Sequence, residues 1–196
     1  MTPPNDALSF EAKLKKIRIN GPAPVDKWNP KFCGDVDIQI KKNGNWYHNG
    51  KKINRKPLIK VFSNILKKEN DKFFLVTPFE KVGIKVEDVP FLINDLEIKG
   101  YGKKQKILVK TNVDEKVVIN KKNYLKFRID EKTEEPFPYV LIRDNLEGLI
   151  DRKNFYRLIE KVQIEMLNDV EWYGIWSNEI FFPIQKAVDL DINLNE

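Results

Sequence analysis

Hydrophobic and polar positions along the chain follow two different periods, which predict both strands and helices. Polar and apolar residues alternate from Asp35 to Ile40, as in a strand with one buried face. Asn43-Gly44 is typical of a hairpin turn, and Trp46-Tyr47 begins the return strand. Further apolar runs, separated in several places by lysine-bearing turns, predict strands in an antiparallel arrangement over residues 73–76, 83–86, 91–98, 106–111, 116–119, 124–129 and 139–142.

Two longer segments have the spacing of an amphipathic helix. After Asn54, a good N-cap type, apolar residues recur at positions 58, 61, 62, 65 and 66, and Asn70-Asp71 ends the pattern. After Asp151, apolar residues recur at positions 155, 158, 159, 162 and 166. Residues 172–184 predict a final strand pair. A shorter helical pattern over 6–17 precedes the Gly and Pro residues at 21–24.

The two helical segments begin alike, which raises the question of an internal repeat. Ile53-Asn54-Arg55-Lys56 aligns with Ile150-Asp151-Arg152-Lys153, and the same offset aligns the apolar positions that follow. Two unrelated helices with similar caps would give the same pattern. A duplicated strand–helix–strand unit would instead produce two related lobes, and ligands often bind where two domains meet.

These patterns predict an α+β protein with two lobes and mostly antiparallel sheets. The expected organisation is an N-terminal arm over residues 1–24, a first lobe over 25–82, a second lobe over 83–186 and an acidic tail over 187–196.

Charge is also distributed unevenly along the chain, with a basic front part and an acidic rear part. The net charge of the 196 residues is +6, but residues 1–132 hold 29 basic and 16 acidic side chains, whereas residues 133–196 hold 6 and 13. A lysine-rich front part favours nucleic-acid binding as an alternative function, with a steep dependence on salt. Against it, 29 of the 35 basic residues are Lys and only 6 are Arg, the better partner for phosphate.

Composition also excludes several classes of protein. One Cys and one His leave no intrachain disulfide and too few ligands for a structural zinc site. The N-terminus has no apolar signal segment, and no apolar run approaches the ~20 residues of a membrane span. The expected location is therefore the bacterial cytoplasm, with no cofactor.

The arginines of the second lobe are the first candidates for ligand binding. Arg143 follows an apolar strand with no lysine nearby, and a guanidinium group suits phosphate or carboxylate. Arg152 lies at a helix start, where an anion is favoured, but an ion pair with a neighbouring acid is the simpler interpretation for it. Asn112 and Asp114 lie between two strands and could bind a base edge or ribose hydroxyls, or could hold the loop by an Asx-turn.

Three further residues lie at strand ends. Thr77 and Glu80 stand in the segment that closes the strand over 73–76, and Trp176 holds a comparable place in the second lobe. They could line a ligand site, although a buried core position is the simpler interpretation for the tryptophan.

Carboxylates offer a third possible function. Asp35 and Asp37 are two apart on a strand, and with Glu80 they could hold a divalent metal for hydrolysis. A solvated sheet face is the simpler interpretation of the pair, because acidic residues two apart are common on exposed strands. No GxGxxG, phosphate loop or nucleophile elbow occurs, so common signals for nucleotide-hydrolysing or redox enzymes are missing.

Several blocks, in order, resemble the bacterial domain-of-unknown-function family 1285 over about residues 20–185. The blocks are Trp28-Asn29-Pro30, Phe32-Cys33-Gly34-Asp35, residues 76–81, 86–91 and 111–114, Ile142-Arg143-Asp144, Ile175-Trp176-Ser177 and Phe181-Phe182-Pro183. The resemblance implies two lobes, the second like a pleckstrin-homology domain, a nucleotide-like ligand between them and a role in signalling. The leading hypothesis is accordingly a non-catalytic module that binds a small anionic ligand between its lobes and signals to a partner protein.

Overall fold

The computed structural model describes residues 21–130, 133 and 135–188 and divides into two compact units, Met1–Pro90 and Phe91–Glu196. The predicted helix over 6–17 and most of the predicted acidic tail lie outside the described residues. The division falls after Pro90, whereas the sequence predicted it between residues 82 and 83. That position is inside strand β6 (Lys81–Val86), which pairs with two other strands of the first unit.

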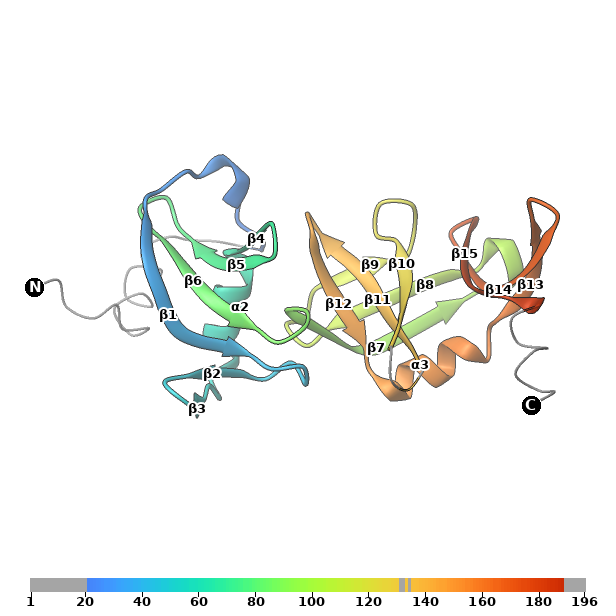
Figure 1. Ribbon diagram of the computed structural model, residues 1–196, viewed down its shortest axis with the longest axis horizontal. Coiled ribbons are helices and arrows are strands. Elements are labelled where there is room, and N and C mark those ends of the chain that lie inside the picture. Colours follow the sequence, from blue (N-terminus) through green and yellow to red (C-terminus); the bar gives the residue numbers. More distant parts are fainter. Residues whose placement is uncertain (1–20, 131–132, 134, 189–196) are drawn as a thin grey trace, which may run out of the picture. The chain divides into compact units, whose positions relative to one another are not determined.

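The first unit is a six-stranded sheet with the helix α2 against one face (Figure 1). The strand order is β3-β2-β1-β6-β5-β4, in which β1 and β6 are parallel and the other neighbours are antiparallel. The elements are η1 (Val25–Lys27), β1 (Phe32–Ile40), β2 (Trp46–His48), β3 (Lys51–Lys52), α2 (Lys56–Asn64), β4 (Leu66–Glu69), β5 (Lys72–Val76) and β6.

The helix α2 is shorter than its apolar spacing predicts. It begins after Arg55, with proline in its first turn, and Asn54 is not its N-cap. It ends at Asn64, and Leu66 begins β4 instead of continuing the helix, so the predicted helical face through Leu66 is wrong. Leu66 is buried from the strand, which means that its hydrophobicity fits either element.

The core of the first unit lies between α2 and the sheet. The ring centroids of Trp46 from β2 and Phe62 from α2 are 6.1 Å apart in a stacked arrangement, and both side chains are fully buried. Leu75 and Val82 are buried cross-strand partners on β5 and β6. Trp46 is therefore a core residue.

The second unit combines a six-stranded sheet, a three-stranded sheet and the helix α3. The larger sheet has the order β10-β11-β12-β7-β8-β9, with β12 and β7 parallel, and the smaller has the order β13-β14-β15. The elements are β7 (Phe91–Lys99), η2 (Gly102–Lys104), β8 (Lys106–Thr111), β9 (Lys116–Val118), β10 (Leu125–Ile129), β11 (Pro136–Arg143), β12 (Leu146–Ile150), α3 (Arg152–Ile159), β13 (Gln163–Leu167), β14 (Val170–Ser177) and β15 (Ile180–Lys186).

The start of α3 follows the sequence closely, but its end does not. Asp151 is the N-cap, and its carboxylate accepts a hydrogen bond from the backbone N–H of Asn154 at 2.8 Å. The helix ends at Ile159, and Met166 lies in β13, so the predicted helical face through Met166 is wrong. The predicted strand pair over 172–184 is present as β14 and β15, with β13 as a third strand.

The turn between β14 and β15 joins the two sheets of the second unit. The buried hydroxyl of Ser177 accepts a hydrogen bond from the backbone N–H of Ile107 at 3.1 Å and donates one to the carbonyl of Ile119 at 2.7 Å. The backbone N–H of Asn178 donates to the carbonyl of Gln105 at 2.7 Å. These bonds fasten the three-stranded sheet to the end of the larger sheet.

The expected α+β class with two lobes and mostly antiparallel sheets is confirmed, although each unit also contains one parallel strand pair.

Candidate functional site

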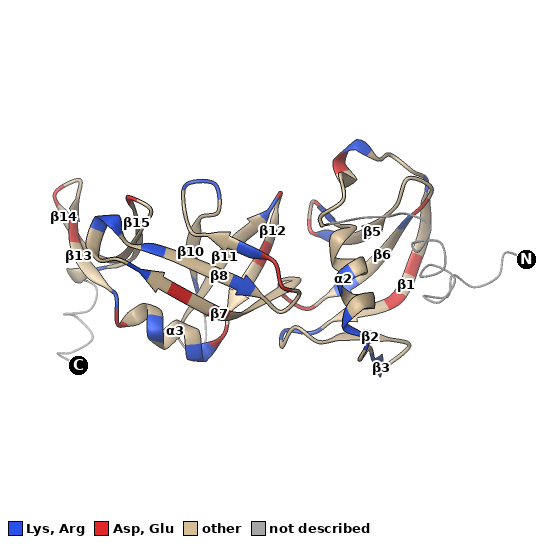
Figure 2. Cartoon of the chain, turned by 180° about the vertical axis from the view of Figure 1, so that it is seen from behind, with Lys and Arg blue, Asp and Glu red and all other residues tan. Residues whose placement is uncertain are grey.

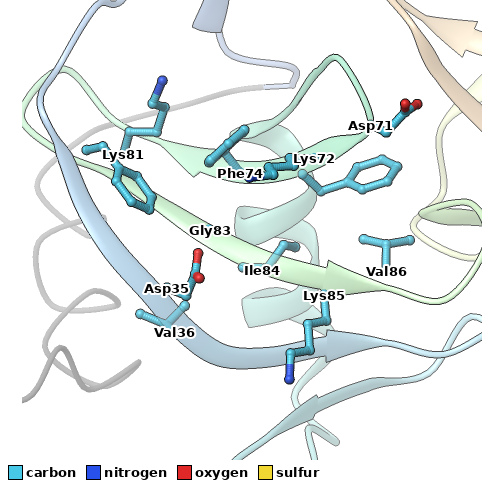
Figure 3. Close-up of a pocket in the computed structure, with 12 residues that line it drawn as sticks. Asp35, Val36, Asp71, Lys72, Phe74, Lys81, Gly83, Ile84, Lys85 and Val86 are labelled. Atoms are coloured by element: carbon cyan, nitrogen blue, oxygen red, sulfur yellow. The ribbon is translucent and has the colours of Figure 1, made fainter.

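An open hollow of about 600 Å³ lies on the first unit's sheet, on the face away from α2 (Figure 3). Strands β1, β5 and β6 form it. Because side chains alternate across a strand, Leu75 and Val82 are directed to one face, whereas their neighbours Phe74 and Gly83 lie on the other. The volume lies within the range of small-molecule sites. We name this hollow the open-face pocket.

The floor of the open-face pocket is aromatic. The ring centroids of Phe32 on β1 and Phe74 on β5 are 6.0 Å apart in an edge-to-face arrangement. Phe74 is 9 % exposed, whereas Phe32 is 54 % exposed. Gly83 carries no side chain, and the carboxylate of Asp35 lies over it, beside Phe32.

Three lysines surround this floor, and one of them is already paired. The ammonium of Lys81 lies 2.9 Å from a carboxylate oxygen of Glu69 and 5.0 Å from the ring centre of Phe74. Lys72 and Lys85 also line the pocket, and their ammonium groups have no ion-pair or hydrogen-bond partner among the residues that the structure describes. Both are exposed.

Lys72 and Lys85 lie on the adjacent strands β5 and β6. The last paired residues of β5 and β6 are Phe73 and Ile84, so one further step of the antiparallel register places Lys72 opposite Lys85. Like charges directly opposite one another destabilise a sheet. An anion bound in the pocket would lessen this repulsion.

Glu69 carries the clearest electrostatic shift beside the pocket. The hydrogen bond from Lys81 is the main cause that lowers the pKa of the Glu69 carboxyl, and Lys67, 3.4 Å away, lowers it further. Partial burial acts in the opposite direction. The pair therefore holds Glu69 ionised and fixes the ammonium of Lys81 over Phe74.

This lowered pKa makes the stability of the first unit depend on pH. The favourable contribution is complete above the ordinary glutamate pKa of about 4.3 and is lost as the pH falls through the lowered value of the folded state. We expect urea unfolding of Glu69→Gln to show lower stability than wild type at pH 7 and a shallower decline below about pH 4.3. Lys81→Gln should flatten the decline in the same way. A decline as steep as that of wild type in both variants would contradict this role of the pair.

Thr77 and Glu80 come together in the turn between β5 and β6. The buried hydroxyl of Thr77 accepts hydrogen bonds from the backbone N–H groups of Phe79 at 3.2 Å and Glu80 at 3.1 Å, and it donates one to the carbonyl of Glu80 at 3.2 Å. Thr77 is 2 % exposed and Glu80 is 8 % exposed. These bonds give Thr77 a turn-forming role.

Arg143, Asn112 and Asp114 come from one corner of the second unit. The guanidinium of Arg143, at the end of β11, pairs with Glu115 and lies 5.0 Å from the ring centre of Phe91. Asn112 accepts a hydrogen bond at 3.1 Å from the backbone N–H of Leu92, next to Phe91. The structure therefore brings these three candidates to the turn between β8 and β9.

The partners in this corner show what the candidate side chains do in the structure. The carboxylate of Asp114 lies 2.7 Å from the ammonium of Lys110, and Asp114 has a positive φ of 67°, which Asp tolerates better than most residues. Asn112 connects the turn to β7. These contacts support the interpretation that Asn112 and Asp114 hold the loop. Arg143 has a carboxylate partner, Glu115, that the sequence did not indicate.

Replacement of Arg143 tests how much its ion pair with Glu115 contributes to the free energy of unfolding. Its side chain is 12 % exposed and that of Glu115 is 20 % exposed, so water screens the pair only in part. We expect Arg143→Ala to reduce the free energy of unfolding by about 1–3 kcal/mol, because a half-buried carboxylate loses a charged partner. Arg152→Ala is the control, since the Arg152 side chain is 72 % exposed and its nearest carboxylate oxygen, of Glu135, is 3.8 Å away. Equal stabilities of the two variants in urea unfolding would contradict the assignment.

Trp176 and Arg152 lie apart from that corner. The indole N–H of Trp176 on β14 donates to Glu165 of β13 at 2.9 Å, and its ring packs on Phe181 at 5.3 Å. Arg152 donates to the hydroxyl of Tyr156 at 3.0 Å, which raises the pKa of its guanidinium further. Arg152 thus has Tyr156 as a local partner and Glu135 as its acidic neighbour, rather than Glu147, Asp144 or Asp151, the partners expected from the sequence.

The three carboxylates considered for a metal site, Asp35, Asp37 and Glu80, do not come together in the structure. β1 departs from regular register on both sides of Asp35, so Asp35 and Asp37 are not a simple pair on a flat strand. Asp35 lines the open-face pocket, whereas Glu80 is buried in the turn after β5. Within residues 21–130, 133 and 135–188, no group of three or more His, Cys, Asp or Glu side chains is arranged to hold a metal ion.

Over the same part of the chain, no helix is long and apolar enough to cross a membrane.

Sequence reasoning missed Lys72, Phe74 and Lys85. The alternation of Lys72, Phe74 and Val76 was visible, as was that of Lys81, Gly83 and Lys85. The pairing of the two strands was not visible, and it is this pairing that gathers the lysines around the aromatic floor.

Comparisons with known proteins agree with the division into two units. Residues 23–89 match the domain of unknown function DUF1285, N-terminal domain, and residues 90–184 match the protein of unknown function DUF1285, C-terminal domain. The crystal structure of a DUF1285 family protein from Silicibacter pomeroyi DSS-3 is 45 % identical, with a TM-score of 0.85, and the match covers 92 % of this chain and 97 % of that one.

A second solved structure shows likeness of fold alone. A DUF1285 family protein from Shewanella baltica OS155 is 24 % identical, with a TM-score of 0.50, and the match covers 64 % of this chain and 92 % of that one. A comparison with curated proteins found no match.

Proposed function

The chain belongs to the DUF1285 family, and we propose that it is a non-catalytic module that binds a small anionic ligand in the open-face pocket of its first unit. The observation that carries the proposal is the pair of lysines, Lys72 and Lys85, that line the pocket without a partner among the described residues. An anion bound in the pocket would gain attraction from both ammonium groups.

The surroundings of the two lysines support a ligand larger than a simple ion. The hollow of about 600 Å³ has room for a small organic molecule, and Phe32 and Phe74 provide apolar surface next to the charges. The combination of an apolar floor with a few charged groups is typical of small-molecule sites. The family resemblance implies a nucleotide-like ligand between the lobes and a role in signalling. The present proposal keeps the small anionic ligand and places it on the first unit instead.

The corner around Arg143 is a second place where an anion could bind. Arg143 is already paired with Glu115, so an anion there would have to compete with a carboxylate, whereas Lys72 and Lys85 need displace none among the described residues. Because an anion at Lys72 and Lys85 meets no competing carboxylate partner of those side chains in the described part of the chain, the open-face pocket is favoured as the primary site.

A titration with inorganic pyrophosphate tests the proposal. Calorimetry on the full chain should show binding that weakens as salt is added, because the ammonium groups are exposed and screened. The double variant Lys72→Gln, Lys85→Gln should bind about tenfold more weakly, which corresponds to the loss of two exposed charge pairs.

The matched control is Lys52→Gln, which removes an exposed lysine from β3 outside the pocket. It should leave the affinity within about twofold of wild type, because only a distant, screened charge is lost. Equal losses in the control and the double variant would indicate general charge attraction and contradict a site at the open-face pocket.

The two other functions foreseen from the sequence make different predictions. Binding of nucleic acid through residues 1–132 should show a steep dependence on salt with DNA or RNA. Figure 2 shows Lys and Arg along the elements of both units. Hydrolysis assisted by Asp35, Asp37 and Glu80 would require a divalent metal.

A further inference from the structure

Two acidic side chains, Asp35 and Asp71, line the open-face pocket among its lysines. Asp71 lies 3.8 Å from the ammonium of Lys68, whereas Asp35 lies unusually close to the backbone of β6. Asp35 of β1 is the partner of Gly83 of β6 in the parallel register. A Cβ atom at position 83 would lie 2.0 Å from the Oδ1 atom of Asp35, so the carboxylate occupies the space that any other residue at 83 would fill. Figure 3 shows Asp35 beside Gly83, within the ring of lining residues.

The backbone of β1 is shaped around this contact. Its register to β6 shifts between Phe32 and Asp35 and again between Asp35 and Gln39. Gly34, immediately before Asp35, has a φ of +94°, a conformation that glycine adopts readily. Bulges of this kind redirect a side chain, and here the redirected group is a carboxylate.

The carboxylate of Asp35 is not neutralised within the described part of the chain. It has no ion-pair partner there, although Lys72, Lys81 and Lys85 line the same hollow. A site for a purely anionic ligand gains nothing from an acidic group, because the carboxylate repels the ligand. A ligand that also carries a positive group or N–H donors would pair with Asp35 as well as with the lysines.

The aromatic floor indicates which chemical group would form the uncharged part of the ligand. The exposed edge of Phe32 and the ring of Phe74 meet at 89°, with Gly83 beside them. A flat apolar group laid against the exposed ring of Phe32, beside the carboxylate that fills the space over Gly83, would gain a favourable aromatic contact.

We infer that the open-face pocket takes a zwitterionic small molecule of the aromatic amino-acid class. Its protonated amine bonds to Asp35, its anionic group bonds to Lys72 and Lys85, and its ring lies against Phe32. The inference rests on the proposed function and adds the positive group and the ring to the anion that it requires.

Three matched probes separate these contributions in the full chain. L-phenylalanine carries the amine, the carboxylate and the ring, N-acetyl-L-phenylalanine has no positive charge, and phenethylamine has no negative charge. Titrations followed by 1H–15N spectra at pH 7 should show phenylalanine binding about tenfold more tightly than either other probe. The amide signals of Asp35 and Gly83 should move.

Two variants connect this preference to the carboxylate. Asp35→Asn keeps the shape but removes the charge, and Gly83→Ala places a Cβ where Oδ1 lies, which displaces the carboxylate. In each, phenylalanine should bind no more tightly than N-acetyl-L-phenylalanine. Preserved preference in both variants would overturn the role of Asp35.

The outcomes distinguish the inference from the proposal beneath it. Equal binding of phenylalanine and N-acetyl-L-phenylalanine to wild type overturns the zwitterionic ligand and leaves an anion site. Binding of pyrophosphate without binding of any of the three probes also overturns the inference alone. Failure of pyrophosphate and all three probes overturns both.

Discussion

Ser177→Ala should reduce the free energy of unfolding of the second unit by about 2–4 kcal/mol. Ser177 is fully buried, and its hydroxyl connects the N–H of Ile107 to the carbonyl of Ile119. Alanine removes both bonds and leaves two buried backbone groups without their partner, each at a cost of about 1–3 kcal/mol. Urea unfolding measures the change, and hydrogen exchange of Ile107 should accelerate because its N–H loses its acceptor.

A second buried serine is the matched control. Ser63 in α2 is 1 % exposed, but its hydroxyl donates locally to the carbonyl of Lys60, at 2.9 Å in the same helix. Ser63→Ala should cost less than Ser177→Ala, because the bond to Lys60 lies within the helix and does not connect two sheets. A larger loss from Ser63→Ala than from Ser177→Ala would contradict the role given to the β14–β15 turn.

Gly174→Ala should destabilise the second unit by about 3 kcal/mol. A Cβ atom at Gly174 would lie 2.3 Å from a ring carbon of Phe181 and 2.6 Å from the carbonyl oxygen of Phe182. The ring can rotate away, but the carbonyl belongs to the adjacent strand β15, so β14 and β15 would have to separate locally. Thermal unfolding measures the effect as a lower Tm.

Two further variants show why Gly174→Ala destabilises the second unit: Gly148→Ala as a control, and Gly174→Ala combined with Phe181→Leu. At Gly148 the nearest atoms to a new Cβ, from Ile93 and Phe91, are all 3.3 Å away and belong to side chains, so the loss should be smaller, about 1 kcal/mol. Phe181→Leu should rescue Gly174→Ala only in part, since the backbone contact remains. Complete rescue would show that the ring, not the strand spacing, requires glycine at 174.

The sequence predicted the types of most elements because their apolar periods are clear, but it misplaced both helix ends. Leu66 and Met166 fit the helical spacing, yet both lie in strands that follow the helices directly. Leu66 is two positions beyond the end of α2 and Met166 is seven beyond the end of α3, and a single sequence does not reveal whether such a residue continues the helix or belongs to a strand. The turn residues Asn70 and Asn168, both with positive φ, mark the hairpins that make these strands.

Which residues meet in the candidate sites depends on how the strands pair, and local sequence patterns do not reveal strand pairing. Arg143 was singled out correctly as an arginine at a strand end, but its partner Glu115 stands 28 positions earlier in the chain. The sheet order β11-β12-β7-β8 brings these two residues together. In the same way, Asp35 was read as half of an acidic pair, whereas its contact with Gly83 depends on the bulges of β1.

The most direct test of the account is the position of the anion. Inorganic pyrophosphate is added to the full chain, and the backbone amide signals are followed in 1H–15N spectra. The account predicts that the signals of Lys72, Gly83 and Lys85 move together with one dissociation constant, and that those of Asn112 and Arg143 remain in place. Movement confined to Asn112 and Arg143, or no movement at all, would contradict it.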